Sequence, residues 1–132
     1  MKQITIQSGT NTMSGLQFTP LHNQQIILCE LQNSERKTIE KFIQEMETFI
    51  GLWGNQPFLI LFDFRNSALK FSPFFADSLK ALPQIDNGRQ AILILGDAER
   101  KQMAFFPNHF ATLDYQFFQS YELALAWLEE LL

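Results

Sequence analysis

Apolar and polar residues alternate along the chain with two different periods, and these periods predict both strands and helices. Strands are predicted where a short apolar run, or strict alternation of apolar and polar residues, is bounded by turn residues. Pro20 and Asn23 mark one such turn. The predicted strands span residues 2–7, 25–31, 58–64, 91–95 and 115–118, with a shorter strand fragment at residues 16–18.

Amphipathic helices are predicted between the strands because apolar residues recur there at steps of three and four. The clearest apolar stripe covers residues 39–53, follows an expected N-cap at Ser34 and ends at Gly54. A shorter helix is expected to begin with Ser72 as N-cap and Pro73 at the first helical position. The inner face of this short helix is formed by Phe75, Leu79 and Leu82.

Two further helices complete the pattern. Asp97 is the expected N-cap of a helix over residues 98–106, which Pro107 breaks or kinks. Ser120 is the expected N-cap of the last helix. The inner stripe of this last helix is predicted to be Leu123, Trp127, Leu128 and Leu131.

The order of the predicted elements is ββαβαβαβα. Strict alternation from the third strand onward predicts parallel strands joined by right-handed crossovers. The first two strands are close in sequence, so we expect them to pair antiparallel. The sequence therefore predicts an α/β domain with a mixed, mainly parallel sheet of about five strands.

Composition narrows the class of protein further. The chain has 132 residues, 46% of them apolar and 18% charged, which suits a single domain over residues 1–132 with a real core. The formal net charge is −4 and no block of basic residues occurs, so nucleic acid is disfavoured as a partner. No apolar segment reaches membrane-spanning length and the N-terminus does not resemble a signal peptide. We therefore expect a cytoplasmic protein without stable membrane insertion.

Few residues suggest catalytic or metal chemistry. The single cysteine, Cys29, lies in an apolar run and is expected to be a buried hydrophobe. The two histidines lack the spacing of a metal site, and neither a nucleophile elbow nor a glycine-rich phosphate loop is present. We therefore expect no enzymatic activity, no metal and no cofactor.

A polar group follows the predicted central strand. It consists of Asp63, Arg65, Asn66 and Ser67. Together with Ser72 and Asp97, these residues are candidates for a polar site or docking patch at the strand ends. Turns and helix caps use the same residue types, and that structural role is the favoured interpretation. For Asp63, likewise, a contact with Arg65 on the same strand face is favoured over an acid-base role.

Phenylalanine is unusually abundant, with 14 residues, and six of them surround two predicted helix positions. One set flanks the start of the second helix and the other flanks the kink of the third. These residues are Phe71, Phe74, Phe75, Phe105, Phe106 and Phe110. Both sets are expected on the same side of the sheet, where they would line an apolar groove, or else form core or a homodimer face.

Three stretches carry a resemblance to a known family: LILFDF at residues 59–64, RQAILILGD at residues 89–97 and FFQSYELALAWLEEL at residues 117–131. With this spacing, residues 39–132 resemble a STAS domain, and more closely the SpoIIAA-like (STAS/SEC14-type) branch of small bacterial proteins. The resemblance implies a regulatory or scaffolding domain that acts through protein-protein interaction.

The family also implies two alternatives. Its anti-sigma-factor antagonists carry a phosphorylatable serine in an Asp-Ser-Ser-Gly-like turn after the central strand, and Ser72 lies near that place, with Ser67 as a second candidate. The surrounding sequence KFSPF, however, lacks the acidic residue, the paired serine and the glycine. SEC14-type relatives hold lipids in an apolar pocket.

These observations rank the functions. The leading expectation is a non-enzymatic, homodimeric domain with a protein partner, because no catalytic motif occurs and aromatic residues are in excess. The alternative is a binder of a lipid or other small apolar molecule through the phenylalanine-lined groove. A phosphorylation switch at Ser72 or Ser67 is the third possibility.

Overall fold

The computed structural model describes residues 15–110 and 113–132, so the strand predicted at residues 2–7 lies outside the described residues. Five strands form one sheet in the order β1-β2-β3-β4-β5. The first pair is antiparallel and the remaining pairs are parallel. The predicted mixed, mainly parallel α/β fold is therefore confirmed. The strands are β1 (Leu16–Leu21), β2 (Ile26–Leu31), β3 (Phe58–Asp63), β4 (Gly88–Leu93) and β5 (Asp114–Phe118).

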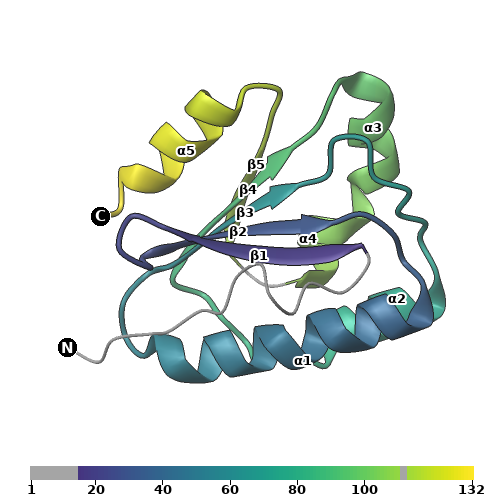
Figure 1. Cartoon of the computed structure of the whole chain (residues 1–132), viewed down its shortest axis with the longest axis horizontal. Helices are drawn as coiled ribbons and strands as arrows, with labels where there is room; N and C mark the ends of the chain where they lie inside the picture. Colours follow the sequence, from purple (N-terminus) through teal and green to yellow (C-terminus); the bar gives the residue numbers. More distant parts are fainter. Residues whose placement is uncertain (1–14, 111–112) are drawn as a thin grey trace.

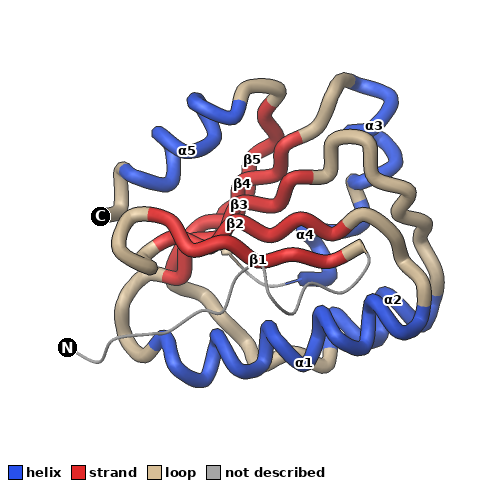
Figure 2. Tube along the Cα trace, in the orientation of Figure 1, coloured by secondary structure: helices blue, strands red, loops and turns tan. Residues whose placement is uncertain are grey.

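The helices cover the two faces of the sheet unequally. They are α1 (Arg36–Trp53), α2 (Pro73–Lys80), α3 (Asp97–Met103), α4 (Phe105–Phe110) and α5 (Tyr121–Glu129). Because the strands lie side by side in chain order, right-handed crossovers place α1, α2 and α4 on the same face. Among the described helices, only α5 packs on the opposite face, mainly over β4 and β3 (Figures 1 and 2).

Each face of the sheet carries its own core. The larger core holds an aromatic centre in which the Phe62 ring lies 4.7 Å from the Phe106 ring and 6.3 Å from the Phe42 ring, measured between centroids. The smaller core joins Leu59 and Leu61 of β3 to α5 through Ala124 and Leu128, all of them buried. Successive side chains of the central strands point to opposite faces of the sheet and therefore pack into two separate cores.

The start of α1 differs from the prediction. Ser34 is not its N-cap: Glu35 holds that position without a side-chain cap. The Ser34 hydroxyl instead accepts a hydrogen bond from the backbone N–H of Lys70 at 3.0 Å. The Ser34 hydroxyl, which the local sequence predicts as the cap of α1, is therefore used in a contact between segments that are distant in the chain. The end of α1 is as predicted, because Gly54 adopts a φ of 73° there, where a side chain would cause strain.

Strand β1 is longer than the predicted fragment, and Pro20 lies inside it rather than in the turn. A hydrogen bond of 2.7 Å from Gln32 N–H to the Gly15 carbonyl fixes the alternation of the β1–β2 pair. Residues 16, 18 and 20 therefore direct their backbone groups away from β2. The missing N–H of Pro20 costs this ladder no hydrogen bond, which is why proline is tolerated on the edge strand.

Between β4 and β5, the structure differs from the prediction at the N-cap of α3 and at the position where that helix breaks. Asp97 does not cap α3, because Gly96 occupies the N-cap position and no side chain bonds there. The helix breaks at Ala104, before Pro107, and α4 then starts afresh at Phe105. This early break places Pro107 in the first turn of α4, where its missing N–H would have no helical partner in any case.

The last helix is rotated relative to the predicted stripe. Leu128 is buried as expected and Trp127 is half-buried, but Leu123 is 64% exposed and Leu131 lies at the surface. Ala124, a small residue, occupies the centre of the contact instead. The predicted N-cap is confirmed, because the Ser120 hydroxyl accepts a hydrogen bond from Leu123 N–H at 3.3 Å.

The N-cap of α2 gives a direct stability prediction. The Ser72 hydroxyl accepts a hydrogen bond from Phe75 N–H at 3.1 Å, and Pro73 follows at the first position, both as predicted. Ser72→Ala should lower the free energy of unfolding by about 1 kcal/mol, because one terminal N–H loses its partner. Ser72→Asp should retain most of the stability, since a carboxylate also caps.

Chemical denaturation monitored by circular dichroism measures both variants. Ser78→Ala is the matched control, because it makes the same change inside α2 at a position that caps nothing. Equal losses for Ser72→Ala and Ser78→Ala would contradict the capping role.

Candidate functional site

The loop after β3 satisfies most of its polar groups internally. Arg65 binds Asp63 through both prongs of its guanidinium group, with Nε–Oδ1 and Nη2–Oδ2 distances of 3.0 and 2.9 Å. The backbone N–H of Arg65 also donates to Asp63 Oδ1 at 3.1 Å. The hydrogen bond to Asp63 is the main cause of a raised pKa at Arg65. The predicted contact between Asp63 and Arg65 is thus confirmed.

The rest of this loop is shaped by turn chemistry. Asn66 adopts a φ of 62°, a left-handed conformation that asparagine tolerates better than most residues. The Ser67 hydroxyl donates to the Phe64 carbonyl at 2.8 Å, which closes the turn. Ser67 and Ser72, the two candidate phosphoacceptors, therefore both use their hydroxyls in local structure. Their phosphorylation stays a prediction.

Asp97 is not bound to this loop: among residues 15–110 and 113–132, no hydrogen bond or ion pair joins it to the residues after β3. It is exposed at the start of α3. Two other carboxylates, Glu122 and Glu30, are close enough to Arg65 to raise its pKa further. No sequence pattern pointed to these two glutamates, because Glu30 lies in β2 and Glu122 at the start of α5, both far from Arg65 in the chain.

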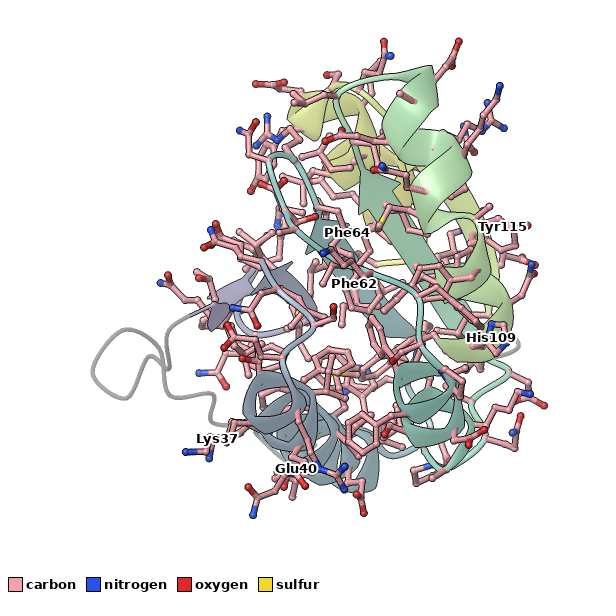
Figure 3. All side chains as sticks on the ribbon, turned by 90° about the vertical axis from the view of Figure 1, so that its right-hand side faces the viewer. Lys37, Glu40, Phe62, Phe64, His109 and Tyr115 are labelled. Atoms are coloured by element: carbon pink, nitrogen blue, oxygen red, sulfur yellow. The ribbon has the colours of Figure 1, made fainter. Side chains whose placement is uncertain are left out.

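The six predicted phenylalanines separate into core and surface. Phe75, Phe106 and Phe110 are buried, with 0%, 0% and 3% of their area exposed. Figure 3 shows Phe62 and Phe64 in the same interior, where both rings meet the Phe106 ring edge to face. Half of the predicted set therefore belongs to the larger core.

The remaining aromatic residues include a partly exposed group between the start of α2 and α4. Phe71 is 56% exposed, and its ring lies 5.0 Å from the Phe105 ring and 6.0 Å from the His109 ring. We call Phe71, Phe105 and His109 the Phe71 surface. The His109 Nδ1 atom lies 2.6 Å from the Phe105 carbonyl oxygen, so the ring donates a hydrogen bond from Nδ1 to that oxygen.

Phe74 belongs to a different feature, a groove of about 650 Å³ between α1 and α2. Its apolar floor includes Ile43, Phe74 and Ala81, and its rim includes Lys37 and Lys41. Figure 3 shows Lys37 and its neighbour Glu40 on the outer side of α1. Of the six predicted residues, this lining includes only Phe74, and Phe75, Phe106 and Phe110 are buried. Within residues 15–110 and 113–132, the six phenylalanines therefore do not line one common groove.

A second pocket, of about 290 Å³, lies at the amino end of β3 and β4. Amide side chains dominate its polar lining, and Asp86 is the only charged residue there. No prediction placed a site here, because the amides read as turn residues in the sequence. Within the part of the chain that is described, no three His, Cys, Asp or Glu side chains are grouped so that they could hold a metal ion.

Comparison with known proteins adds no relative: no family model, no curated protein and no solved structure matches this chain. None of the described helices combines the length and apolar character needed to cross a membrane. The STAS resemblance therefore stays a prediction, and what the chain does must be argued from its own residues.

The split of the phenylalanine set predicts unequal mutational effects. Phe106→Ala should lower the free energy of unfolding by about 3–5 kcal/mol, because it empties the centre of the larger core. Phe71→Ala, at the exposed position, should cost less than about 1 kcal/mol. Urea denaturation of the two variants measures this contrast, and similar losses for both would contradict the assignment of Phe71 to the surface.

Cys29 provides a test of burial. The thiol is 0% exposed, and burial raises its pKa well above the usual range, with a smaller contribution from the nearby Glu30 carboxylate. A raised pKa leaves less thiolate at pH 8, so labelling by a thiol reagent should be at least about a hundredfold slower in the native protein than in denaturant. Rapid labelling without denaturant would show that β2 is accessible.

Proposed function

We propose that this chain is a non-enzymatic, STAS-like regulatory or scaffolding domain of the bacterial cytoplasm that acts through protein-protein contacts, and that it forms a homodimer. The observation that carries the proposal is the Phe71 surface. An aromatic side chain more than half exposed, resting on a second aromatic ring and a histidine, is costly to leave in water. Aromatic anchors of this kind are enriched at the centres of protein interfaces.

The packing beneath Phe71 favours a surface contact over a pocket. The Phe75 ring lies 5.6 Å from the Phe105 ring and 6.0 Å from the Phe106 ring, and both Phe75 and Phe106 are fully buried. Edge-to-face rings at these distances fill the space in which an apolar ligand would sit. A partner would therefore lie on Phe71 rather than insert beneath it.

The test compares tagged wild-type and variant chains purified from cells of the source organism. Phe71→Ser should lose a protein that the wild type retains, because the aromatic anchor is removed. Leu95→Ser is the matched control, since Leu95 is also 56% exposed but lies in the loop between β4 and α3. Retention of the same proteins by Phe71→Ser, or their equal loss from Leu95→Ser, would contradict the proposal.

A lipid or other apolar ligand remains the second candidate, and the groove between α1 and α2 favours it. Its apolar floor around Phe74 would accept an acyl chain. The charged lining holds both Lys37 and Lys41 and the carboxylates of Glu40 and Glu47, so a polar headgroup would find partners of either sign there. Lys41 already binds Glu45 at 2.9 Å, which leaves Lys37 as the more available cation of the two.

Native mass spectrometry of the unlabelled protein separates the two candidates. The interaction domain predicts a dimer without additional mass. A co-purifying molecule that is released on denaturation, and that is absent from Phe74→Asp, would instead support the ligand-binding alternative. Phe71→Ser is the matched variant here, because it leaves the lining of the groove unchanged.

A further inference from the structure

The outer edge of β5 has unpaired backbone groups. The Phe118 carbonyl accepts a hydrogen bond from Ile94 N–H at 2.9 Å, which fixes the alternation of the β4–β5 pair. In a parallel pair, residues that face the neighbour alternate with residues that face away, so Asp114, Gln116 and Phe118 bond toward β4. Tyr115 and Phe117 direct both N–H and C=O outward. Among the described strands, none pairs with that side of β5.

This edge lacks the features that protect the opposite edge of the sheet. On β1, the outward positions end at Pro20, which offers no N–H to an incoming strand. The sequence of β5, DYQFF, contains no proline, no lysine and only one charged residue, Asp114. Exposed edges without such residues readily accept another strand.

Apolar side chains flank the β5 edge on both faces of the sheet. On the face of the larger core, Tyr115 is 45% exposed and its ring lies 6.1 Å from that of Phe117. Figure 3 places Tyr115 at the margin of the molecule, away from Lys37 and Glu40 of α1. On the other face, Leu123 is 64% exposed and lies one turn before Trp127, whose ring is 5.7 Å from that of Phe118.

We propose that β5 is a dimerisation strand: it pairs antiparallel with β5 of a second copy, so that the two sheets join across a two-fold axis at Gln116. In this register, Tyr115 of each copy lies opposite Phe117 of the other. These are the residues whose N–H and C=O groups point outward, so they exchange backbone hydrogen bonds. The contact is self-complementary, as a two-fold dimer requires.

Charge and aromatic pairing favour this register over its neighbours. The two Asp114 carboxylates lie four residues apart along the paired strands, about 13 Å, which exceeds the screening length of about 8–10 Å at ordinary ionic strength. A shifted register that sets Asp114 opposite itself would place like charges together. The proposed register also sets an aromatic ring opposite an aromatic ring at both hydrogen-bonded pairs, which stabilises antiparallel strands.

The dimer would use a surface separate from the Phe71 surface. This inference rests on the homodimer of the proposed function and names its interface, whereas the contact of a different protein with Phe71 holds or fails on its own test. Phe71 precedes α2 and contacts α4, whereas the β5 edge lies at the end of the sheet. A chain that dimerises through β5 leaves the Phe71 surface available to a different partner.

Cysteine crosslinking tests both the pairing and its register. Gln116 would face Gln116 of the second copy as a non-hydrogen-bonded pair, with a Cα–Cα distance of about 4.5 Å, within the range that a disulfide spans. Gln116→Cys should therefore form a covalent dimer with a mild oxidant such as oxidised glutathione. Asp114→Cys is the matched control on the same strand and face, and it should form little dimer because it lies opposite Phe118 of the second copy. The native Cys29 is buried in both variants.

Sedimentation measurements on the complete chain give a second readout. Tyr115→Pro removes only an outward N–H and leaves the ladder to β4 intact, so it should weaken dimerisation by at least about tenfold. Phe71→Ser should dimerise like the wild type, which separates the β5 dimer from the partner contact proposed at Phe71. Circular dichroism checks the folding of Tyr115→Pro, and if that variant unfolds, the crosslinking pair decides.

Three outcomes would overturn the proposal. The first is a wild-type chain that stays monomeric at concentrations of about 100 μM, which lies above the dissociation constants of specific dimers. The second is an unchanged dimer in folded Tyr115→Pro. The third is crosslinking of Asp114→Cys as efficiently as Gln116→Cys, which would place the strands in another register or apart.

Discussion

The contact on which the structure depends is the packing of α4 against β3. Phe106 and Phe110 meet the Phe62 ring at centroid distances of 4.7 and 5.0 Å, and Phe106 also meets Phe64 at 4.9 Å. This contact fixes where the chain crosses from β4 to β5, and it closes the layer that α1 and α2 begin. Phe71 contacts this layer through the Phe105 ring, but the layer does not enclose it.

The strand order explains why, among the described helices, only α5 covers the second face of the sheet. With strands in chain order, the crossovers have no reason to change face, so the sheet lacks the reversal point at which open α/β sheets usually bind ligands. The polar side chains after β3 accordingly bind one another, as Asp63 and Arg65 do. The exposed features lie elsewhere, on the Phe71 surface, in the groove between α1 and α2, and along β5.

Much of the fold could be read from the sequence, because periodicity and turn residues act locally. The stripe of α1, the Ser72 and Ser120 caps and the four parallel strands depend on residues near one another in the chain. The errors arise where distant groups compete. Ser34 bonds to Lys70 instead of capping α1, and Pro20 enters a strand because, among the described strands, β1 pairs only with β2.

The candidate site was harder to predict for the same reason. Phe71, Phe74 and Phe75 are nearly adjacent in sequence, yet one is exposed, one lines a groove and one is fully buried. The direction of each ring depends on the helix start and on what packs above it, and composition cannot supply either. Glu30 and Glu122 near Arg65 come from separate elements, and no local motif connects them.

The position of α5 has a consequence for how the protein opens. The smaller core is separated from the aromatic core by the sheet itself. Arg89 of β4 binds the end of α5, where it donates to the Trp127 carbonyl at 2.7 Å and to Glu130 at 2.8 Å. Releasing α5 breaks these bonds and uncovers Leu59 and Leu61 without disturbing a contact on the other face. We therefore expect the amide hydrogens of α5 to exchange with solvent through a local opening that needs less free energy than the unfolding of β3.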